Sequence, residues 1–151
     1  MQTQSFPSLS EAETADLRAV AGVAIPADVG FGVPAADDPT ILADILATLG
    51  RDTGDVRAAL AELSVLAKGP FANLDNDQRD EIATAYLAGS GVPARTLGRV
   101  MLQAYYRDDR VVRSLGLEPR PPFPKGHTLE QGDWSLLDPV RARPKLWRDA
   151  P

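Results

Sequence analysis

The sequence contains one histidine, His127, and two carboxylates follow it closely, Glu130 and Asp133. An imidazole titrates near neutral pH, and a nearby carboxylate can orient it or share its proton. These three residues are therefore the best candidates for acid–base chemistry. A structural interpretation competes with this one. His127 lies in a loop, where it could hydrogen-bond to backbone or to a partner, and Asp133 could cap a turn beginning at Trp134.

Other catalytic or metal-binding patterns are missing from the sequence. It has no cysteine, which excludes disulfides, thiolate metal sites and cysteine nucleophiles. Gly30-Phe31-Gly32 follows a predicted helix instead of a strand, so it does not fit a dinucleotide-binding loop. Neither a nucleophile elbow nor an aspartate-rich calcium loop occurs. We therefore expect no catalytic residue, no metal and no cofactor in this chain.

Apolar residues recur at helical spacing through most of the chain. Three helix starts are marked by capping residues: Ser10 with Glu13 three positions later, Asp38 before a proline, and Asp75. Strand-like alternation is nearly absent. The sequence predicts an all-α bundle of five or six short helices. They cover about residues 10–25, 38–49, 54–68, 75–88 and 93–105, and the last continues or restarts to residue 116.

The last part of the chain, 117–151, has a different composition from the helical domain predicted for 1–116. It is rich in proline and contains both tryptophans, Trp134 and Trp147. Disordered tails are usually poor in aromatic residues, because such chains lack the apolar surface that offsets the entropy of ordering. We therefore predict a long irregular arm that packs on its own domain, on a partner subunit, or on both.

Charge is unevenly distributed along the chain, whose net charge is −5. Residues 1–94 hold fourteen acidic and five basic residues, and 95–151 hold seven acidic and eleven basic ones. The arginines alternate with acids, as in 107–110, so we do not expect nucleic-acid binding. No apolar run reaches the roughly 20 residues of a membrane span. As written, the sequence has no secretory or twin-arginine signal, which predicts a cytoplasmic protein, or a periplasmic one if a signal was removed or a partner supplies it.

Two segments resemble the gluconate 2-dehydrogenase subunit 3 family. The first, 6–28, reads FPSLSEAETADLRAVAGVAIPAD. It matches the family's opening pattern, in which a capped helix ends in Ile-Pro before a Gly/Pro loop, through Leu9, Ser10, Glu13, Leu17, Ala21, Ile25 and Pro26. The second, AYYRDDRVVRSLG, is followed by PPFPKGH, QGDW and LLDP, and is similar to the C-terminal part of small subunits that pair with flavin dehydrogenases.

The resemblance implies a small, non-catalytic subunit of a heterodimer. Its partner would be a large FAD-containing oxidoreductase of the glucose–methanol–choline (GMC) type that oxidises a sugar, glycoside or other alcohol. FAD would then be bound by the partner. Such small subunits support folding, stability and often export of the flavin subunit. Many carry a twin-arginine signal, and this sequence departs from that pattern, which leaves a chaperone-like stabilising role.

Tyrosine, tryptophan and arginine are the residue types most often found as interface hot spots, and proline lowers the entropy that an arm loses on docking. Each candidate could instead cover the chain's own helices. Two further functions stay open: a small helical enzyme that uses His127 with Glu130 or Asp133, and a general helical interaction module. The candidate interface residues are Tyr105, Tyr106, Arg110, Phe123, His127, Trp134, Arg141, Arg143 and Trp147.

Overall fold

The structure is a computed structural model that describes residues 8–119 and 131–145. The chain forms two compact units, 1–119 and 120–151. The first is a bundle of short helices, and the second contains the described part of the C-terminal arm.

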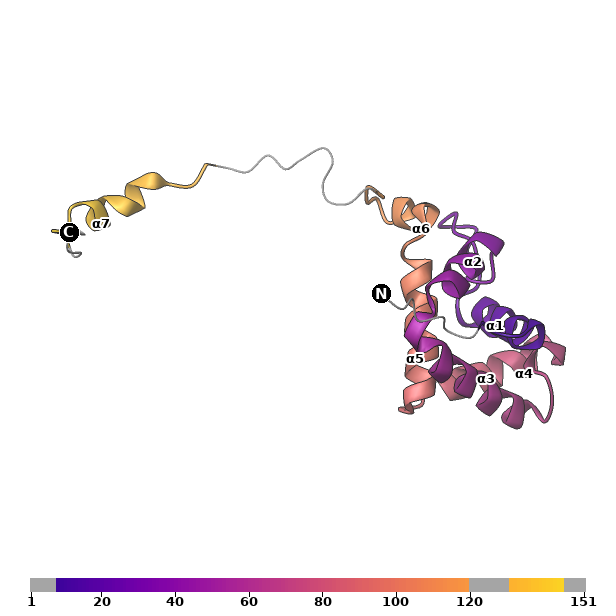
Figure 1. The fold of residues 1–151 in the computed structure, drawn as a ribbon. Coiled ribbons are helices and arrows are strands. Elements are labelled where there is room, and N and C mark those ends of the chain that lie inside the picture. Colours follow the sequence, from indigo (N-terminus) through magenta and orange to yellow (C-terminus); the bar gives the residue numbers. More distant parts are fainter. Residues whose placement is uncertain (1–7, 120–130, 146–151) are drawn as a thin grey trace. The chain divides into compact units, whose positions relative to one another are not determined.

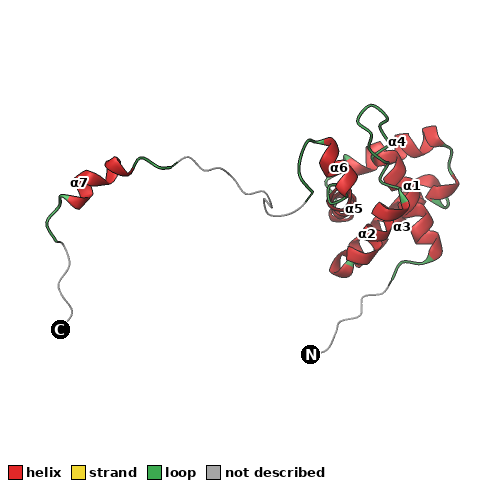
Figure 2. Cartoon of the chain, turned by 90° about the horizontal axis from the view of Figure 1, so that it is seen from above, coloured by secondary structure: helices red, strands yellow, loops and turns green. Residues whose placement is uncertain are grey.

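The first unit contains six α-helices (Figure 1). Short 3-10 turns, η1 (Gly50–Asp52) and η2 (Phe71–Asn73), follow α2 and α3. Within 8–119 and 131–145 there is no β-strand, only a single β-bridge (Figure 2). The predicted all-α class is confirmed. The helices are α1 (Glu11–Ala24), α2 (Pro39–Thr48), α3 (Thr53–Ala67), α4 (Asn76–Leu87), α5 (Val92–Tyr105) and α6 (Asp109–Ser114).

The helices begin where the capping residues predict. Ser10 and Glu13 form a complete capping box, with the Ser10 amide 2.7 Å from Glu13 Oε2. Asp38 accepts a bond from the Thr40 amide, and Asp75 accepts one from the Gln78 amide, both at 2.9 Å. These side chains satisfy amides that have no partner inside the helix. The last predicted helix restarts instead of continuing, because Asp108 caps α6 separately after the turn that ends α5.

The core lies where α3 meets the other helices. Helix α3 packs against α5, α4 and α1. Helix α2 also packs against α5, and η2 lies against α1. The helix faces that meet there are apolar, so hydrophobic burial is the main force holding the bundle together. The largest fully buried side chains are Phe71, Leu17, Ile41, Ile45, Leu60, Leu63, Leu97, Met101, Val20, Val56 and Val111.

In the second unit, 131–145 contains two short helical stretches. A 3-10 turn, η3 (Trp134–Leu137), runs directly into one α-helical turn, α7 (Asp138–Arg141). This part of the arm therefore has more local structure than the irregular ribbon that proline content suggested. Pro139 is compatible with it because proline fits the first turn of a helix, where its missing amide costs no hydrogen bond.

Candidate partner interface

The described part of the arm presents large apolar side chains to solvent. Trp134 is 61% exposed and Leu136 is 73% exposed. Leu137 and Val140 are also exposed, one and two helical turns beyond Trp134. Short helical segments dock into apolar grooves through side chains at this spacing. The segment 134–140 can therefore offer several apolar anchors to one partner surface.

Local hydrogen bonds fix the start of this segment. Asp133 accepts bonds from the Ser135 hydroxyl at 2.6 Å and from its amide at 3.0 Å. These bonds favour the ionised carboxylate and lower the pKa of Asp133. The indole Nε1 of Trp134 donates to Gln131 Oε1 at 3.0 Å. The prediction that Asp133 caps the turn at Trp134 is confirmed, and this use of the carboxylate competes with a role as a catalytic base.

Basic side chains follow the apolar segment. Arg141 pairs with Asp138 at 3.3 Å, and both side chains are largely exposed, so the pair contributes little to stability. Arg143 is exposed as well. Apolar anchors beside arginines are a common composition for protein interfaces.

Tyr105 and Tyr106 lie at the end of α5 and have opposite environments. Their rings meet edge to face, with centroids 5.5 Å apart. Tyr105 is only 6% exposed and belongs to the core, and burial raises the pKa of its hydroxyl. Tyr106 is 55% exposed. Of the two candidates, Tyr105 therefore serves the chain's own core, while Tyr106 is accessible to a partner.

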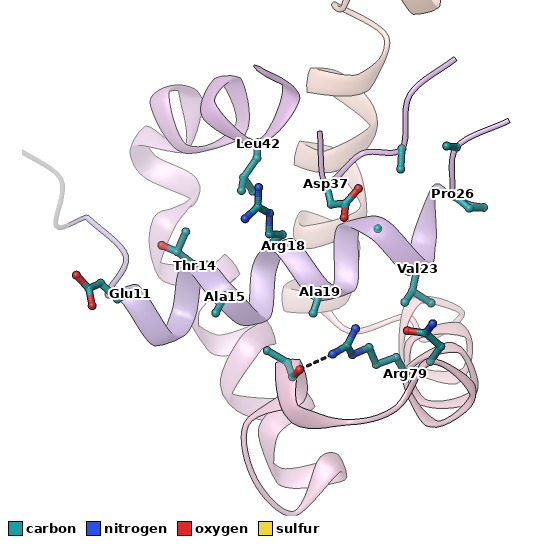
Figure 3. A pocket seen from close by; sticks show the side chains of 15 residues that line it. Glu11, Thr14, Ala15, Arg18, Ala19, Val23, Pro26, Asp37, Leu42 and Arg79 are labelled. Carbon is teal, nitrogen blue, oxygen red and sulfur yellow. Dashed lines mark hydrogen bonds between the residues drawn. The ribbon is translucent and has the colours of Figure 1, made fainter. Parts of the chain in front are cut away.

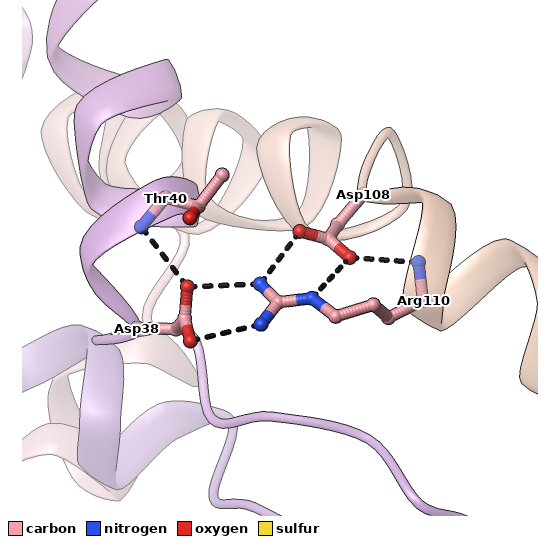
Figure 4. A network of polar contacts seen from close by, with 4 residues as sticks. All are labelled: Asp38, Thr40, Asp108 and Arg110. Atoms are coloured by element: carbon pink, nitrogen blue, oxygen red, sulfur yellow. Dashed lines mark hydrogen bonds and ion pairs between the residues drawn. The ribbon is translucent and has the colours of Figure 1, made fainter.

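Arg110 is bound to two carboxylates of its own bundle (Figure 4). It contacts Asp38 through two nitrogens at 2.8 and 3.1 Å, and Asp108 through two at 2.8 and 2.9 Å. The hydrogen bonds from Arg110 lower the pKa of Asp38 to about 2 and that of Asp108 below its usual value. The paired carboxylates in turn raise the pKa of Arg110. Arg110 therefore ties α6 to the start of α2. Its contacts are those of the second alternative, in which the residue stabilises the chain's own helices.

The remaining candidates, Phe123, His127 and Trp147, lie outside the described residues, as does Glu130. Within the described ranges, no three His, Cys, Asp or Glu side chains converge in a way that could hold a metal ion. No helix in these ranges is both long and apolar enough to cross a membrane.

A groove on the first unit was not predicted. It runs along α1, has a volume of about 730 Å³ and is floored by small residues, including Ala15, Ala19 and Gly22 (Figure 3). Arg18 and Asp37 lie on one side of α1 and Arg79 on the other. Residues at both ends of the loop between α1 and α2 line the wall of this groove. The sequence offers one signal for such a groove, the small residues Ala15, Ala19 and Gly22 at helical spacing on α1.

Asp16 is a buried polar residue that sequence reasoning also missed. Its carboxylate accepts the Ala72 amide at 2.8 Å and the Ser64 hydroxyl at 3.3 Å. These bonds connect α1 to η2 and α3. Asp16 directly precedes Leu17, a buried apolar residue of α1. A charged residue beside a buried position was the only sequence signal that Asp16 connects helices.

No family model, curated protein or solved structure matches the chain. The candidate interface therefore rests on two features of the described residues: the apolar segment 134–140 and the exposed side chain of Tyr106.

Proposed function

We propose that this chain is a non-catalytic accessory subunit that binds and stabilises a large FAD-dependent oxidoreductase of the GMC type, acting on a sugar, glycoside or other alcohol. FAD and the catalytic residues belong to the partner. The small chain contributes binding surface that favours the folded, flavin-loaded state of the partner, since anything that binds only the folded state stabilises it.

The observation that carries the binding role is the exposed apolar segment 134–140. Trp134, Leu136, Leu137 and Val140 project from a stretch that is already turned and capped by Asp133. A preorganised segment loses less entropy on docking than an extended one. Tryptophan is among the commonest interface hot spots. The identity of the partner comes from the resemblance of 6–28 and 104–139 to the gluconate 2-dehydrogenase subunit 3 family.

Co-expression tests the proposal. A GMC-type flavin oxidoreductase from the same organism is produced alone, with the wild-type chain, and with the double variant Leu136→Ser/Leu137→Ser. We expect soluble, flavin-loaded, alcohol-oxidising enzyme only with the wild-type chain, and strongly reduced yield with the double variant. The matched control is Leu66→Ser, because Leu66 is an exposed leucine on α3. A large subunit that is stable, flavin-loaded and active without this chain would contradict the proposal.

A further inference from the structure

The loop between α1 and α2 is held in one conformation by hydrogen bonds. Asp28 and Val33 exchange both backbone hydrogen bonds, at 3.1 and 3.0 Å, which closes a four-residue turn. The Phe31 amide donates to Asp28 Oδ1 at 3.0 Å, and the Gly32 amide donates to the Val29 carbonyl at 3.3 Å. We call residues 28–33 the hairpin. These bonds leave its tip little conformational entropy to lose on binding.

Both glycines of the hairpin favour this shape. Gly32 has φ +65°, in the left-handed region that glycine occupies without strain. A Cβ at Gly30 would lie 3.1 Å from Asp28 Oδ1, the atom that accepts the Phe31 amide. The turn is thus specified by its sequence, although no partner within the bundle covers it.

Among residues 8–119, the three most exposed large apolar side chains are Val29, Val65 and Phe31, and two of these, Val29 and Phe31, lie at the tip of the hairpin. Val29 is 97% exposed and Phe31 is 72% exposed. Single exposed apolar residues are ordinary on protein surfaces. Here, however, two of them share a rigid four-residue turn, and one is a phenylalanine. Aromatic residues are enriched among the anchors of protein interfaces.

The loop between α1 and α2 also contains the carboxylates of Asp28 and Asp37. Asp28 lies in the hairpin and Asp37 follows it beside the groove (Figure 3). Neither forms an ion pair with any residue in the described ranges. Asp37 packs on the backbone of α1, where a Cβ at Gly22 would lie 3.0 Å from its Cγ. Arg18 on α1 also lines this groove.

We propose that the hairpin is a second docking site for the flavin subunit, in which Phe31 and Val29 enter an apolar pocket whose rim is basic. This inference rests on the proposed function for the identity of the partner. A protein fits better than an anionic membrane surface, because peripheral membrane segments use lysine and arginine, whereas the hairpin has only an acidic residue and 1–94 carries a net charge of −9. A second copy fits less well, since two acidic surfaces would face each other.

The test starts from the purified complex of the labelled wild-type chain with its flavin subunit, and competition by unlabelled full-length variants gives their dissociation constants relative to the wild type. We expect Phe31→Ser to weaken binding about tenfold or more, and Val29→Ser to weaken it by a smaller factor. The matched control is Val65→Ser, because Val65 on α3 is likewise a highly exposed valine, at 76%. Thermal unfolding of all three isolated variants should match the wild type, since each side chain contacts mainly solvent. Binding of Phe31→Ser within twofold of the wild type overturns the inference.

A second measurement separates the hairpin from the proposed function. Benzoylphenylalanine replaces Phe31, or Val65 as the control, in cells that produce this chain at its natural level. A cross-link to the flavin subunit that forms from position 31 but not from position 65 supports both the hairpin docking site and the proposed function. If the wild-type chain does not bind the flavin subunit, the proposed function fails. The hairpin is then supported only if position 31 cross-links to one other identified protein whose purified form binds the wild type more tightly than Phe31→Ser. Equal labelling at both positions, cross-links between copies, or Phe31-dependent binding to phosphatidylglycerol vesicles would overturn it.

Discussion

The guanidinium of Arg110 lies 2.8 Å from the carboxylate of Asp38, a residue 72 positions earlier in the chain. Asp38 is at the same time the N-cap of α2, and its Oδ1, one of the two oxygens that bind Arg110, also accepts the Thr40 amide. One carboxylate therefore both starts α2 and holds α6 against it. Because Asp108 caps α6 and also binds Arg110, the two helix starts are joined through one cation (Figure 4).

Replacing Arg110 tests this link. Arg110→Ala leaves Asp38 and Asp108 without their cation, and the Asp108 side chain is only 8% exposed. We expect the free energy of unfolding to fall by about 1–2 kcal/mol, more than for an ordinary surface pair. Urea unfolding followed by circular dichroism measures the change. Arg113→Ala is the control, since its i,i+4 pair with Asp109 is exposed on both sides and should contribute less than about 0.5 kcal/mol. Equal losses in the two variants would contradict the link.

The same network predicts how stability depends on pH. The folded-state pKa of Asp38 is about 2, below its usual value of 3.8. A group whose pKa is lowered by folding stabilises the protein above its unfolded-state pKa, and this contribution disappears as pH falls through the folded-state value. Stability should therefore decrease between about pH 4 and pH 2. Asp38→Asn, measured by urea unfolding at several pH values, should be less stable at neutral pH and show a shallower loss over this range. A variant that loses stability as steeply as the wild type would refute this assignment.

The helices could be predicted because their signals are local. A capping side chain acts within three residues of the helix start, so Ser10, Asp38 and Asp75 specify those starts without tertiary information. The same holds for Asp133 at the start of η3. An exception is the end of α3, where Lys68 takes the left-handed conformation with φ 56° although Gly69 follows it. The Lys68 amide bonds to the Ser64 and Val65 carbonyls, so a local cap ends the helix there without glycine in the left-handed position.

The contacts between helices could not be predicted in the same way. Asp16 reaches Ala72 across 56 positions, and Asp38 reaches Arg110 across 72. A periodic pattern places each residue on a helix face but does not say which other face it meets. The exposure of Phe31 could not be predicted for a related reason. Gly30 and Gly32 indicate a loop, but they do not indicate whether the apolar residue between them is buried.

The buried carboxylate of Asp16 should be one of the more sensitive positions in the bundle. Asp16 is 7% exposed, and Asp16→Ala would leave the Ala72 amide and the Ser64 hydroxyl without this acceptor. Leaving such donors unsatisfied costs about 1–3 kcal/mol. Asp16→Asn retains one acceptor oxygen and should lose less. Thermal unfolding of both variants measures this order, and an alanine variant as stable as the asparagine variant would show that the hydrogen bonds contribute little.

Two helical glycines should respond differently to alanine. At Gly98 in α5, a new Cβ would meet only Leu87 Cδ2 at 3.9 Å, an ordinary contact. Gly98→Ala should therefore stabilise the bundle by about 0.5–1 kcal/mol through helix propensity. At Gly22 in α1, the Cβ would lie 3.0 Å from both Cγ and Oδ2 of Asp37, so the carboxylate must move. Gly22→Ala should lose most of the propensity gain to this crowding.

A double-mutant cycle isolates the cause of that difference. Asp37→Ala removes the crowding atoms, so Gly22→Ala should stabilise the Asp37→Ala background nearly as much as Gly98→Ala stabilises the wild type. Urea unfolding of the four proteins gives the coupling between the two positions. A coupling near zero would mean that Asp37 adjusts freely, and that its position on α1 is not fixed by the absence of a side chain at Gly22. A clear coupling would establish that this glycine holds one of the carboxylates flanking the hairpin in place.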